Sequence, residues 1–465
     1  MRSWRTRALA AGLLVAIAGC DLDTQMAPDT VPPINAAVGS ATAGQYIVLF
    51  RHRAVPGDFS AQVQALGGSV TAVWPKVGIA AVRGLDATGA RRLGTSGAIE
   101  AVEDDAMLTL EEVSGRVEAI AGGAVASPDN PAGAVGFPRQ WNMRLIQADL
   151  AWAAGKLGDP GVMLAILDTG IDYLYPDLAG RVDLARSVSF IASDDALVAT
   201  MFPGRHPVTD LHWHGTHVAA TAVSNALILA GVTSKTTLIG VKVCNQNGSC
   251  PTSSVLGGIL YAADAGADVA NLSLGGAFSK RIKQNAGFVS VINRVLNYAQ
   301  QQGMLVVVAA GNAAIDMDHN GPLFHTYCDG PGVVCVSAVG PIAGAGTNGP
   351  WTDPDAFAGY SNYGRSAISV AAPGGNLGGP VWSGCSTSSL QIPICQLGIF
   401  VLASNGTSMA SPHVAGIAAL LARRYDNPSL LRAKIQQTAD DILQRGTDPF
   451  SGKGRVNAAW AAGAH

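Results

Sequence analysis

The sequence predicts an α/β fold with a doubly wound, mostly parallel sheet, preceded by a small α+β domain of the ferredoxin-like type. From residue 138 onward, continuous apolar runs alternate with helical patterns. Such runs suit a parallel sheet covered by helices on both faces. Residues 45–110 follow the order strand, helix, strand, strand, helix, strand. The length of 465 residues leaves room for about two to three domains.

The composition supports a packed chain. Hydrophobic residues make up 48% of the sequence, charged residues 14%, and there are 56 glycines. A disordered chain would instead combine low hydrophobicity with high net charge. The net charge is −3 at pH 7, and no run or stripe of Lys and Arg occurs, so we expect no nucleic-acid partner.

Residues 1–20 have the features of an export signal. Three arginines precede an apolar run at residues 8–18, which is too short to span a bilayer, and small residues lead to Cys20. Residues 17–20 also resemble a bacterial lipobox, in which the cysteine is lipidated after cleavage. Two alternatives stay open: a lipid on Cys20 that tethers the chain to a membrane, or an ordinary cleaved signal with a chance cysteine. No other run is long and apolar enough to cross a membrane.

The N-terminal part is expected to contain two linkers around the small domain. Residues 21–44 are rich in Pro, Gly, Ala, Ser and Thr, and residues 111–137 lose the regular pattern and contain several Gly and Pro. The small domain between them, at residues 45–110, is expected to have strands at 46–50, 69–74, 78–82 and 99–102, and helices at 59–66 and 87–93.

The large domain is expected at residues 138–465. In a doubly wound sheet, functional groups gather at the carboxyl ends of the strands. Its expected strands are 162–167, 237–243, 269–274, 304–309 and 333–339, and helices are expected at 253–265 and 289–302.

Six cysteines remain when Cys20 is set aside, and an even number in an exported chain predicts disulfides. Sequence alone permits many pairings, but pairing of neighbours closes three short loops. Zinc binding is disfavoured because no C-x-x-C spacing occurs. The neighbour pairs are Cys244 with Cys250, Cys328 with Cys335, and Cys385 with Cys395.

The first segment that can carry chemistry follows an apolar strand. Asp168 comes directly after the run 162–167 and is followed by Thr-Gly. A carboxylate at the tip of a buried strand can be shielded from water and can orient an imidazole. In isolation, the pattern is equally typical of a turn after a strand.

The second segment holds His212, His214 and His217 at the start of a helix rich in small residues. Three histidines this close could bind a metal, because histidine is the commonest metal-binding side chain. A helical zinc motif needs histidines at i and i+4 with a glutamate between them. His214 and His217 are three apart with no glutamate between them, so a metal is disfavoured, and His217 can simply pack on the helix.

The third segment places Ser408 at or just before an apolar helix that contains Pro412 in its first turn. Free backbone N–H groups and the positive end of the helix dipole lie at such a position. A serine there can attack a carbonyl carbon while its own N–H holds the resulting oxyanion. The simpler alternative is a helix N-cap.

Together the three segments resemble the signature regions of the subtilisin-like serine peptidases, D-T/S-G, H-G-T-H and G-T-S-M-A-x-P, in that family's order Asp, His, Ser. The resemblance covers residues 138–463. It implies a serine endopeptidase that acts on protein or peptide substrates, with Asp168, His214 and Ser408 as its triad. It also implies that no cofactor is required for catalysis.

Further segments extend the resemblance. Residues 305–312 look like the strand that ends in the family's oxyanion asparagine, here Asn312, and residues 271–276 resemble the edge strand that pairs with an extended peptide. Their small, uncharged side chains predict a broad apolar preference for the residue before the cut. The expected substrate-binding residues are Ser273, Leu274, Gly275, Ala309, Ala310 and Gly311.

Residues 45–110 resemble the inhibitor-type propeptide of the same family, also in the closing residues 102–105. This resemblance implies a self-processing precursor cut within residues 106–137 and inhibited by its own propeptide. The strand 334–340 and the spacing of Cys328 and Cys335 look closer to the proteinase K branch.

The family often holds a structural calcium in a loop after the histidine helix. Here residues 225–233 have lost the acidic and amide ligands, and only Asp177 still matches a ligand position, so this site is not expected.

The resemblance therefore implies an exported, monomeric enzyme that is extracellular, or anchored through Cys20 until it is processed. Two alternatives come from other classes. One is a metal-dependent hydrolase that uses His212, His214 and His217. The other is a catalytically silent binding protein on a peptidase scaffold, which would need a missing catalytic group.

Overall fold

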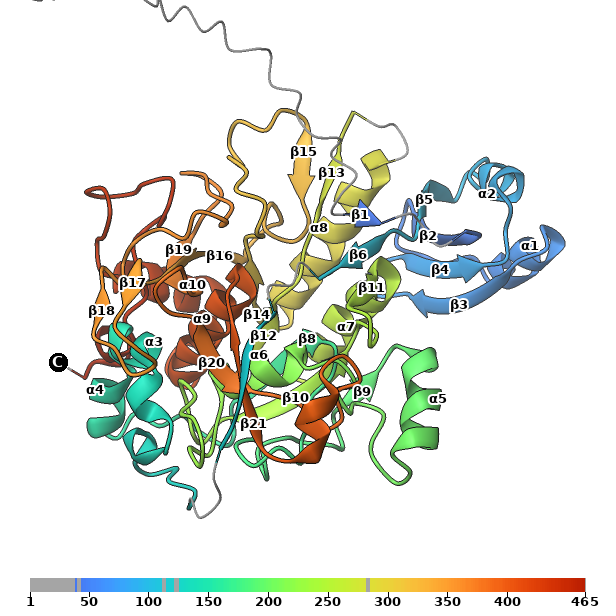
Figure 1. Ribbon diagram of the computed structural model, residues 1–465. Helices are drawn as coiled ribbons and strands as arrows, with labels where there is room; N and C mark the ends of the chain where they lie inside the picture. The colour runs from blue at the N-terminus through green and yellow to red at the C-terminus, as the bar shows by residue number, and fades with distance from the viewer. Residues whose placement is uncertain (1–37, 40–42, 111–113, 121–124, 282–284, 465) are drawn as a thin grey trace, which may run out of the picture. The chain divides into compact units, whose positions relative to one another are not determined.

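A seven-stranded sheet forms the centre of the large domain in this computed structural model, which describes residues 38–39, 43–110, 114–120, 125–281 and 285–464 (Figure 1). Every neighbouring pair of its strands is parallel. The order of the strands departs from their sequence order, so the chain crosses over between them, as in a doubly wound sheet. In sheet order the strands are β19 (Val370–Pro373), β16 (Val334–Val339), β14 (Leu305–Ala309), β12 (Val269–Leu272), β8 (Met163–Asp168), β10 (Thr237–Lys242) and β9 (Val188–Ser189).

Helices cover both faces of this sheet. On one face, α6 (His214–Ala222) and α9 (Thr407–Leu421) pack against alternate strand residues such as Leu164 and Ile166. On the other face, α7 (Thr252–Asp264) and α8 (Ala286–Gln301) pack against Ala165 and Leu167. Successive strand residues thus enter different cores, which explains why these strands are continuous apolar runs.

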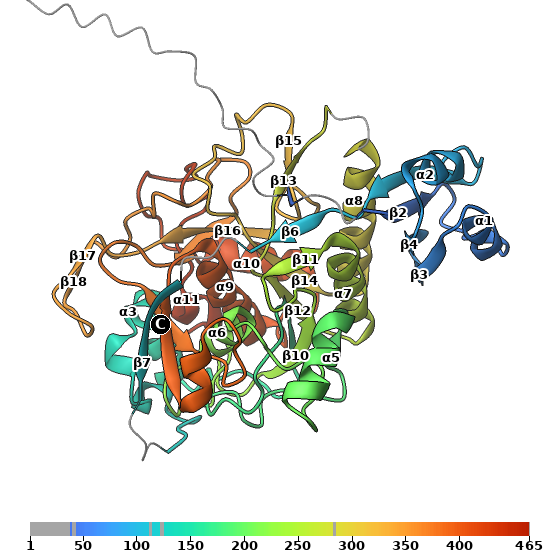
Figure 2. The ribbon, with the colours of Figure 1, turned by 45° about the vertical axis from the view of Figure 1, so that its right-hand side comes forward.

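A four-stranded antiparallel sheet contains the strands of the small domain, in the order β3-β4-β2-β5 (Figure 2). This is the strand order of the expected ferredoxin-like arrangement. One face, with Val48 and Phe50, packs on the two helices of the domain, and the other face, with Ile47 and Leu49, joins the core that contains α7 and α8. The elements are β2 (Gln45–Phe50), α1 (Phe59–Ala65), β3 (Ser69–Trp74), β4 (Ile79–Arg83), α2 (Ala87–Leu93) and β5 (Ile99–Asp104).

Short strands form within both segments expected to be linkers. β7 (Ser114–Ala119) pairs antiparallel with β21 (Phe400–Ser404), which also pairs with β20 (Val381–Gly384). β6 (Met107–Thr109) lies between β1 (Val38–Gly39) and β11 (Ser249–Pro251). Two further strand pairs join β13 (Ala277–Ser279) to β15 (Leu323–His325) and β17 (Ala343–Gly344) to β18 (Trp351–Thr352).

The described elements agree closely with the expected ranges, and the differences lie at element ends. Strand β5 runs to Asp104 rather than to residue 102, and α8 begins at Ala286 rather than at residue 289. β12 ends at Leu272 rather than at residue 274. Helix α9 begins at Thr407, so Ser408 lies inside its first turn and Pro412 lies beyond that turn, not within it as expected.

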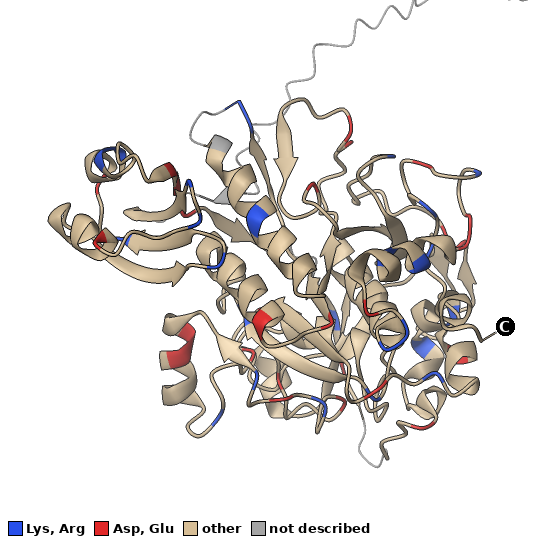
Figure 3. Cartoon of the chain, turned by 180° about the vertical axis from the view of Figure 1, so that it is seen from behind, with Lys and Arg blue, Asp and Glu red and all other residues tan. Residues whose placement is uncertain are grey.

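The remaining helices are short and lie around the sheet. Lys and Arg are interspersed with Asp and Glu over the molecule, without a stripe of one sign (Figure 3). Among the described residues, no helix combines the length and the apolar character that a membrane span requires. These helices are α3 (Trp141–Leu145), α4 (Ala148–Ala153), α5 (Ala192–Met201), α10 (Pro428–Gln437) and α11 (Ala458–Ala462), with 3-10 turns at Pro131–Gly133, Phe137–Arg139 and Pro393–Leu397.

Candidate active site

A buried carboxylate and imidazole meet where a central strand ends and a helix begins. Asp168 is the last residue of β8, and His214 is the first residue of α6. The His214 Nδ1 atom lies 2.8 Å from Asp168 Oδ1, and the two residues are 3% and 0% exposed. A carboxylate in this position fixes the orientation of the ring and stabilises its protonated form.

Two glycines allow this close approach. Gly170 has φ of +117°, and a Cβ atom there would lie 2.4 Å from the Val208 oxygen. A Cβ atom on Gly215 would lie 2.0 Å from the Gly170 oxygen. Larger residues would push helix α6 away from the end of β8, so both glycines are required by packing.

Asp210, which the sequence analysis did not single out, ties the strand end to the helix start. Its Oδ1 accepts a hydrogen bond from Thr169 Oγ1 at 2.9 Å, and its Oδ2 accepts one from the Thr216 N–H at 2.9 Å. The Gly215 N–H in turn donates to Thr169 Oγ1 at 2.9 Å. Asp210 therefore satisfies donors on both sides of the pair formed by Asp168 and His214.

Ser408 lies in the first turn of α9 and is 8% exposed. Its hydroxyl donates to the backbone carbonyl oxygen of Ser273 at 3.0 Å. The Ser273 hydroxyl in turn donates to the backbone carbonyl oxygen of Ser408 at 2.8 Å. The Ser408 oxygen is available for this bond because Pro412, four residues on, has no N–H to offer it. The proline thus helps to join the start of α9 to the segment after β12.

Asn312 follows β14 and is held by Thr407. The Asn312 Oδ1 atom accepts hydrogen bonds from both the Thr407 N–H and the Thr407 hydroxyl, each at 2.9 Å. The Thr407 hydroxyl also accepts the Gly311 N–H at 3.0 Å. Fixing the oxygen of the amide fixes the direction of its Nδ2 donor group as well.

A pocket brings the expected residues together. Ser408 and Asn312 line it, and so do all six residues expected to bind substrate, Ser273, Leu274, Gly275, Ala309, Ala310 and Gly311. Helix α6, which carries His214, packs against α9, which carries Ser408.

Further residues of the pocket were missed from the sequence. His325 and Thr326 line it from β15 and the residue that follows it. Asn362 also lines it and donates from Nδ2 to the Ala310 oxygen at 2.8 Å, which supports the pocket wall. Thr109 and Leu110 reach it from the end of β6. These residues lie far from Ser408 in the sequence, and no sequence pattern indicated that they would line the same pocket.

The three histidines of the helix start do not share one site. The Nδ1 atom of His212 accepts the His214 N–H at 3.2 Å, whereas His217 Nε2 faces the Leu402 oxygen at 3.1 Å. Burial, and then the charge of His214, lower the pKa of His217 to about 3. Across the described ranges, no group of three or more His, Cys, Asp or Glu side chains is arranged to hold a metal ion.

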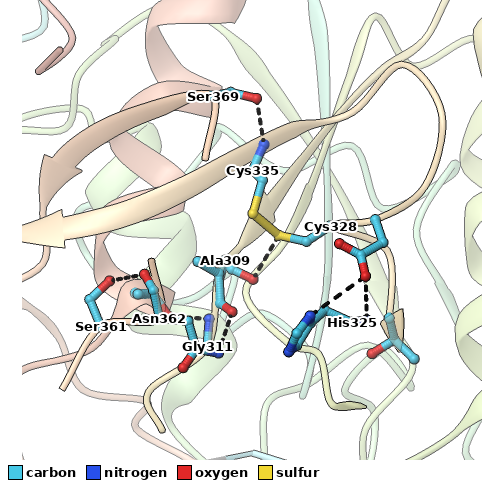
Figure 4. The surroundings of a disulfide bond; sticks show 12 residues. Ala309, Gly311, His325, Cys328, Cys335, Ser361, Asn362 and Ser369 are labelled. Atoms are coloured by element: carbon cyan, nitrogen blue, oxygen red, sulfur yellow. Dashed lines mark hydrogen bonds and ion pairs between the residues drawn. A yellow bond between two sulfur atoms is a disulfide. The ribbon is translucent and has the colours of Figure 1, made fainter. Parts of the chain in front are cut away.

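The disulfides follow the pairing of neighbours: Cys244–Cys250, Cys328–Cys335 and Cys385–Cys395. The first begins just after β10 and ends in β11. The second lies behind the pocket wall, with Cys328 Sγ 3.6 Å from the Ala309 oxygen (Figure 4). Cys20 lies outside the described residues.

Asp177 is bound in a way that does not fit calcium. Its Oδ1 accepts the N–H groups of Leu227 and Ile228 at 3.0 and 2.7 Å, and its Oδ2 accepts that of Leu229 at 3.0 Å. Burial raises the pKa of this carboxyl to about 6. A calcium ion needs oxygen ligands, but here both oxygens face backbone donors of the loop that would have to supply the others.

The comparisons with known proteins agree with this geometry. The model of the subtilase family matches residues 159–454. Thermitase from Thermoactinomyces vulgaris is 35% identical over 323 residues, which are 69% of this chain and 94% of that protein. Subtilisin Savinase from Lederbergia lenta is 32% identical over 324 residues, 68% of this chain and 96% of that protein.

Solved structures show the same fold. Fervidolysin from Fervidobacterium pennivorans, a keratinolytic enzyme related to subtilisin, aligns over 91% of this chain and 61% of its own, with a TM-score of 0.63 and 23% identity. The epidermin leader peptide processing serine protease of Staphylococcus aureus aligns over 90% and 97%, with a TM-score of 0.67 and 20% identity. Because the family model matches residues 159–454, which are most of the chain, the chain belongs to the subtilase family of serine endopeptidases.

Proposed function

We propose that the chain is an exported endopeptidase that cleaves peptide bonds through an acyl-enzyme on Ser408 and is made as a self-processing precursor. The observation that carries this proposal is the buried contact of 2.8 Å between Asp168 and His214, on a helix that packs against the helix of Ser408. Ser408 shares its pocket with Asn312, so a nucleophile and an amide donor border the same space.

In the proposed mechanism, His214 takes the proton of the Ser408 hydroxyl as its oxygen attacks the peptide carbonyl carbon. Asp168 holds the imidazole and stabilises its charged form. The Asn312 amide and the Ser408 N–H stabilise the oxyanion of the tetrahedral intermediate. His214 then protonates the leaving amine, and water repeats the steps on the acyl-enzyme. No metal or organic cofactor takes part in these steps.

Contacts at two helix starts support the proposal that residues 45–110 are a propeptide. Glu103 Oε1 accepts the Gly287 N–H, in the first turn of α8, at 2.9 Å. Asp105 Oδ1 accepts the Ser253 N–H, in the first turn of α7, at 2.8 Å. Both carboxylates thus satisfy donors that a helix leaves open at its start.

The course of the chain after the small sheet supports inhibition by this segment. Strand β6 pairs with β11, and the Leu110 N–H continues the ladder to the Gly248 oxygen at 2.9 Å. Thr109 and Leu110 then line the pocket of Ser408, and we propose that they exclude a substrate from it. We place the processing cut between Leu110 and β7, inside the expected range 106–137.

Export, lipidation of Cys20 and the monomeric state belong to the same proposal and rest on the sequence alone. Residues 1–20 lie outside the described residues. A cut after Leu110 would leave any lipid on Cys20 with the propeptide and release the enzyme. Assignment to the proteinase K branch also stays a prediction.

Replacement of Ser408 by alanine tests the proposal. The wild-type chain should separate into propeptide and enzyme during expression, and a fluorophosphonate probe should label the enzyme. The variant Ser408→Ala should stay one chain and take no label, because the acyl-enzyme cannot form. Gel electrophoresis and mass spectrometry of both proteins measure the outcome.

Ser429→Ala is the matched control, because Ser429 is the second residue of α10, as Ser408 is of α9. It should process and label as the wild type does. Equal processing of Ser408→Ala would exclude self-cleavage by this serine. Chelator-sensitive hydrolysis without probe labelling would instead favour a metal-dependent hydrolase.

A further inference from the structure

Strand β7 covers one edge of β21, the strand that leads to Ser408. β21 is the middle strand of the small sheet that β20, β21 and β7 form (Figure 2). It ends at Ser404, four residues before Ser408. Without β7, the backbone N–H and C=O groups on this side of β21 would form a free sheet edge, to which an extended peptide can add as a strand.

The backbone, rather than the side chains, holds β7 in this place. The ladder between the two strands continues from the Ile120 N–H to the Ile399 oxygen at 3.1 Å. None of residues 115–119 is buried, whereas residues 401–404 all are. Pairing through the backbone accepts many sequences. Another extended peptide can therefore take the place of β7 on β21.

The course of the chain shows which peptide fits this edge. Leu110 lines the pocket of Ser408, and Ser114, four residues later, pairs with Ser404 of β21. The proposed cut falls between Leu110 and β7, so the chain itself is a substrate that runs from the pocket onto β21. A foreign substrate that crosses Ser408 in the same direction brings the residues after its cut bond to the same edge.

One ion pair fixes a side chain of β7 to the rest of the enzyme. Glu118 Oε2 accepts a hydrogen bond from Arg139 Nη1 at 2.6 Å, and the two side chains are 29% and 17% exposed. The Arg139 Cζ atom lies 4.9 Å from the centre of the Trp382 ring, and Trp382 is buried. Among the described residues, Glu118 is the only acidic partner of Arg139. Departure of β7 would leave this mostly buried guanidinium group without a carboxylate.

A groove of about 570 Å³ lies beside this ion pair and carries positive charge. Arg116 and Arg139 are the only charged residues among the described residues that line it. Arg116 belongs to β7 and would leave with it, whereas Arg139 lies in the 3-10 turn Phe137–Arg139, which stays with the enzyme. The edge without β7 therefore keeps one positive charge, which favours an acidic side chain.

We propose that β21 binds the part of a substrate that follows the cut bond as an added strand, and that Arg139 selects an acidic residue there. The selected residue is the eighth after the one that takes the place of Leu110, as Glu118 is in the chain itself. This inference rests on the proposed function and names a substrate class: extended chains with a carboxylate well beyond the cut. Arg139 binds the substrate and takes no part in the chemical steps.

Peptides of different charge test the selection on the wild-type enzyme, which fluorophosphonate labelling counts. The peptides are identical up to the cut bond and continue for ten residues, with Glu, Gln or Lys at the seventh, eighth or ninth. Glu at the eighth should exceed Gln about three- to tenfold in kcat/KM, the size expected for a partly exposed charge-assisted hydrogen bond, and Lys should be slower than Gln. The seventh and ninth residues should show no such advantage, because neighbouring residues of a strand point to opposite faces. Mass spectrometry of the products identifies the cut bond.

Variants assign the selection to one side chain. Arg139→Gln should cleave the Glu and Gln peptides equally, and Arg139→Glu should cleave the Lys peptide best. Arg139→Lys keeps the charge but not the planar fork, so it should keep part of the Glu advantage. Each comparison is a ratio within one variant, so a change in overall activity cancels. Arg144→Gln is the matched control and should keep the full advantage, because Arg144 also stacks on an aromatic ring, that of Phe137 at 4.5 Å, but does not line the groove.

Strand β7 stays joined to the enzyme after processing and competes with the substrate for β21. Glu118→Gln removes its ion pair, so the KM of the long Glu peptide should fall about threefold or more. Peptides that end three residues after the cut do not reach β21 and serve as the reference in both enzymes. Equal KM values for the long peptide in Glu118→Gln and the wild type would exclude competition by β7.

The outcomes separate the two proposals. Labelled wild-type enzyme that cleaves the short peptides but shows no advantage for Glu at the eighth residue overturns the selection and leaves the proposed function standing. A Glu advantage that persists in Arg139→Gln overturns the role of Arg139. Absence of both labelling and cleavage in the wild type overturns the proposed function itself, and the selection with it.

Discussion

At the scale of single residues, the site is held ready before any substrate arrives. Thr407 uses its N–H and its hydroxyl to hold the oxygen of the Asn312 amide. Ser408 and Ser273 exchange hydrogen bonds in both directions. The amide held in this way does not need to reorganise during the reaction, which is what makes a fixed donor effective for a developing oxyanion. The Ser408 hydroxyl, by contrast, has to turn from the Ser273 carbonyl oxygen to His214 before it reacts.

Asn312→Ala should lower kcat by about 10²–10³, with a small change in KM, because the donor acts on the transition state more than on the bound peptide. That magnitude comes from a subtilisin, a member of the same family. Steady-state kinetics on one peptide measure both constants. Asn247→Ala, a change of a residue that does not line the pocket, should behave as the wild type. An unchanged kcat in Asn312→Ala would remove Asn312 from the mechanism.

The residues that the sequence identified, and those that it missed, differ in a physical way. Asp168, His214, Asn312 and Ser408 each lie in a short segment whose local pattern gives strand end, helix start and motif together. Asp210 bonds to Thr169 in a distant segment, and His325 joins the pocket of Ser408 from strand β15. A single sequence contains no signal of such contacts, so only the folded chain reveals them.

At the scale of elements, the two carboxylates that meet α7 and α8 make the docking of the small sheet sensitive to pH. Burial, opposed by the hydrogen bond from Gly287, raises the pKa of Glu103 from 4.5 to about 7. Burial also raises the pKa of Asp105. The docked state therefore binds protons more tightly than the separated state, and its affinity is highest at low pH.

The sign of this effect gives a prediction for the processed enzyme. The affinity of residues 45–110 for the enzyme should fall as the pH rises from about 4.5 to about 7, by at most about tenfold per pH unit for Glu103. Inhibition constants measured across this range test it. Glu103→Gln should flatten the dependence and leave the part due to Asp105. Inhibition that strengthens with rising pH would contradict the assignment.

The elements that were not predicted are stabilised by contacts with other segments of the chain. Strand β7 has the sequence Ser-Gly-Arg-Val-Glu-Ala, with little apolar alternation, and becomes a strand by pairing with β21. The start of α9 was placed too late because Pro412 suggested a first turn. The helix tolerates Pro412 at this position because the Ser408 carbonyl oxygen accepts a hydrogen bond from the Ser273 hydroxyl instead.

At the scale of the whole molecule, the small sheet divides its residues between two cores. Val48 and Phe50 belong to the core of the small domain, whereas Ile47 and Leu49 join the core of α7 and α8. Arg294, on α8, adds an ion pair to Glu100 at 2.5 Å. One strand thus serves both folding and docking, through its two faces.

Two substitutions on neighbouring residues of β2 should separate these functions. Leu49→Ser should weaken inhibition of the processed enzyme at least about tenfold while the small domain still folds, because a buried apolar contact of about 1.5–3 kcal/mol is lost. Val48→Ser should unfold the small domain itself. Circular dichroism of residues 45–110 and inhibition assays distinguish the two. Equal inhibition by Leu49→Ser and the wild type would exclude docking through this face.

Strands β6 and β7 have one more consequence, which concerns timing. Each is held by its own ladder, β6 on β11 and β7 on β21, and the proposed cut falls between them. A single cut changes the covalent connection of the chain but leaves both strands paired. Activity should therefore lag behind cleavage, until a second event, such as degradation of the small domain by an enzyme that is already free, clears the pocket. In a population of cut molecules, activity would appear late and then rise abruptly, because each freed enzyme degrades the small domains that still cover the pockets of other molecules.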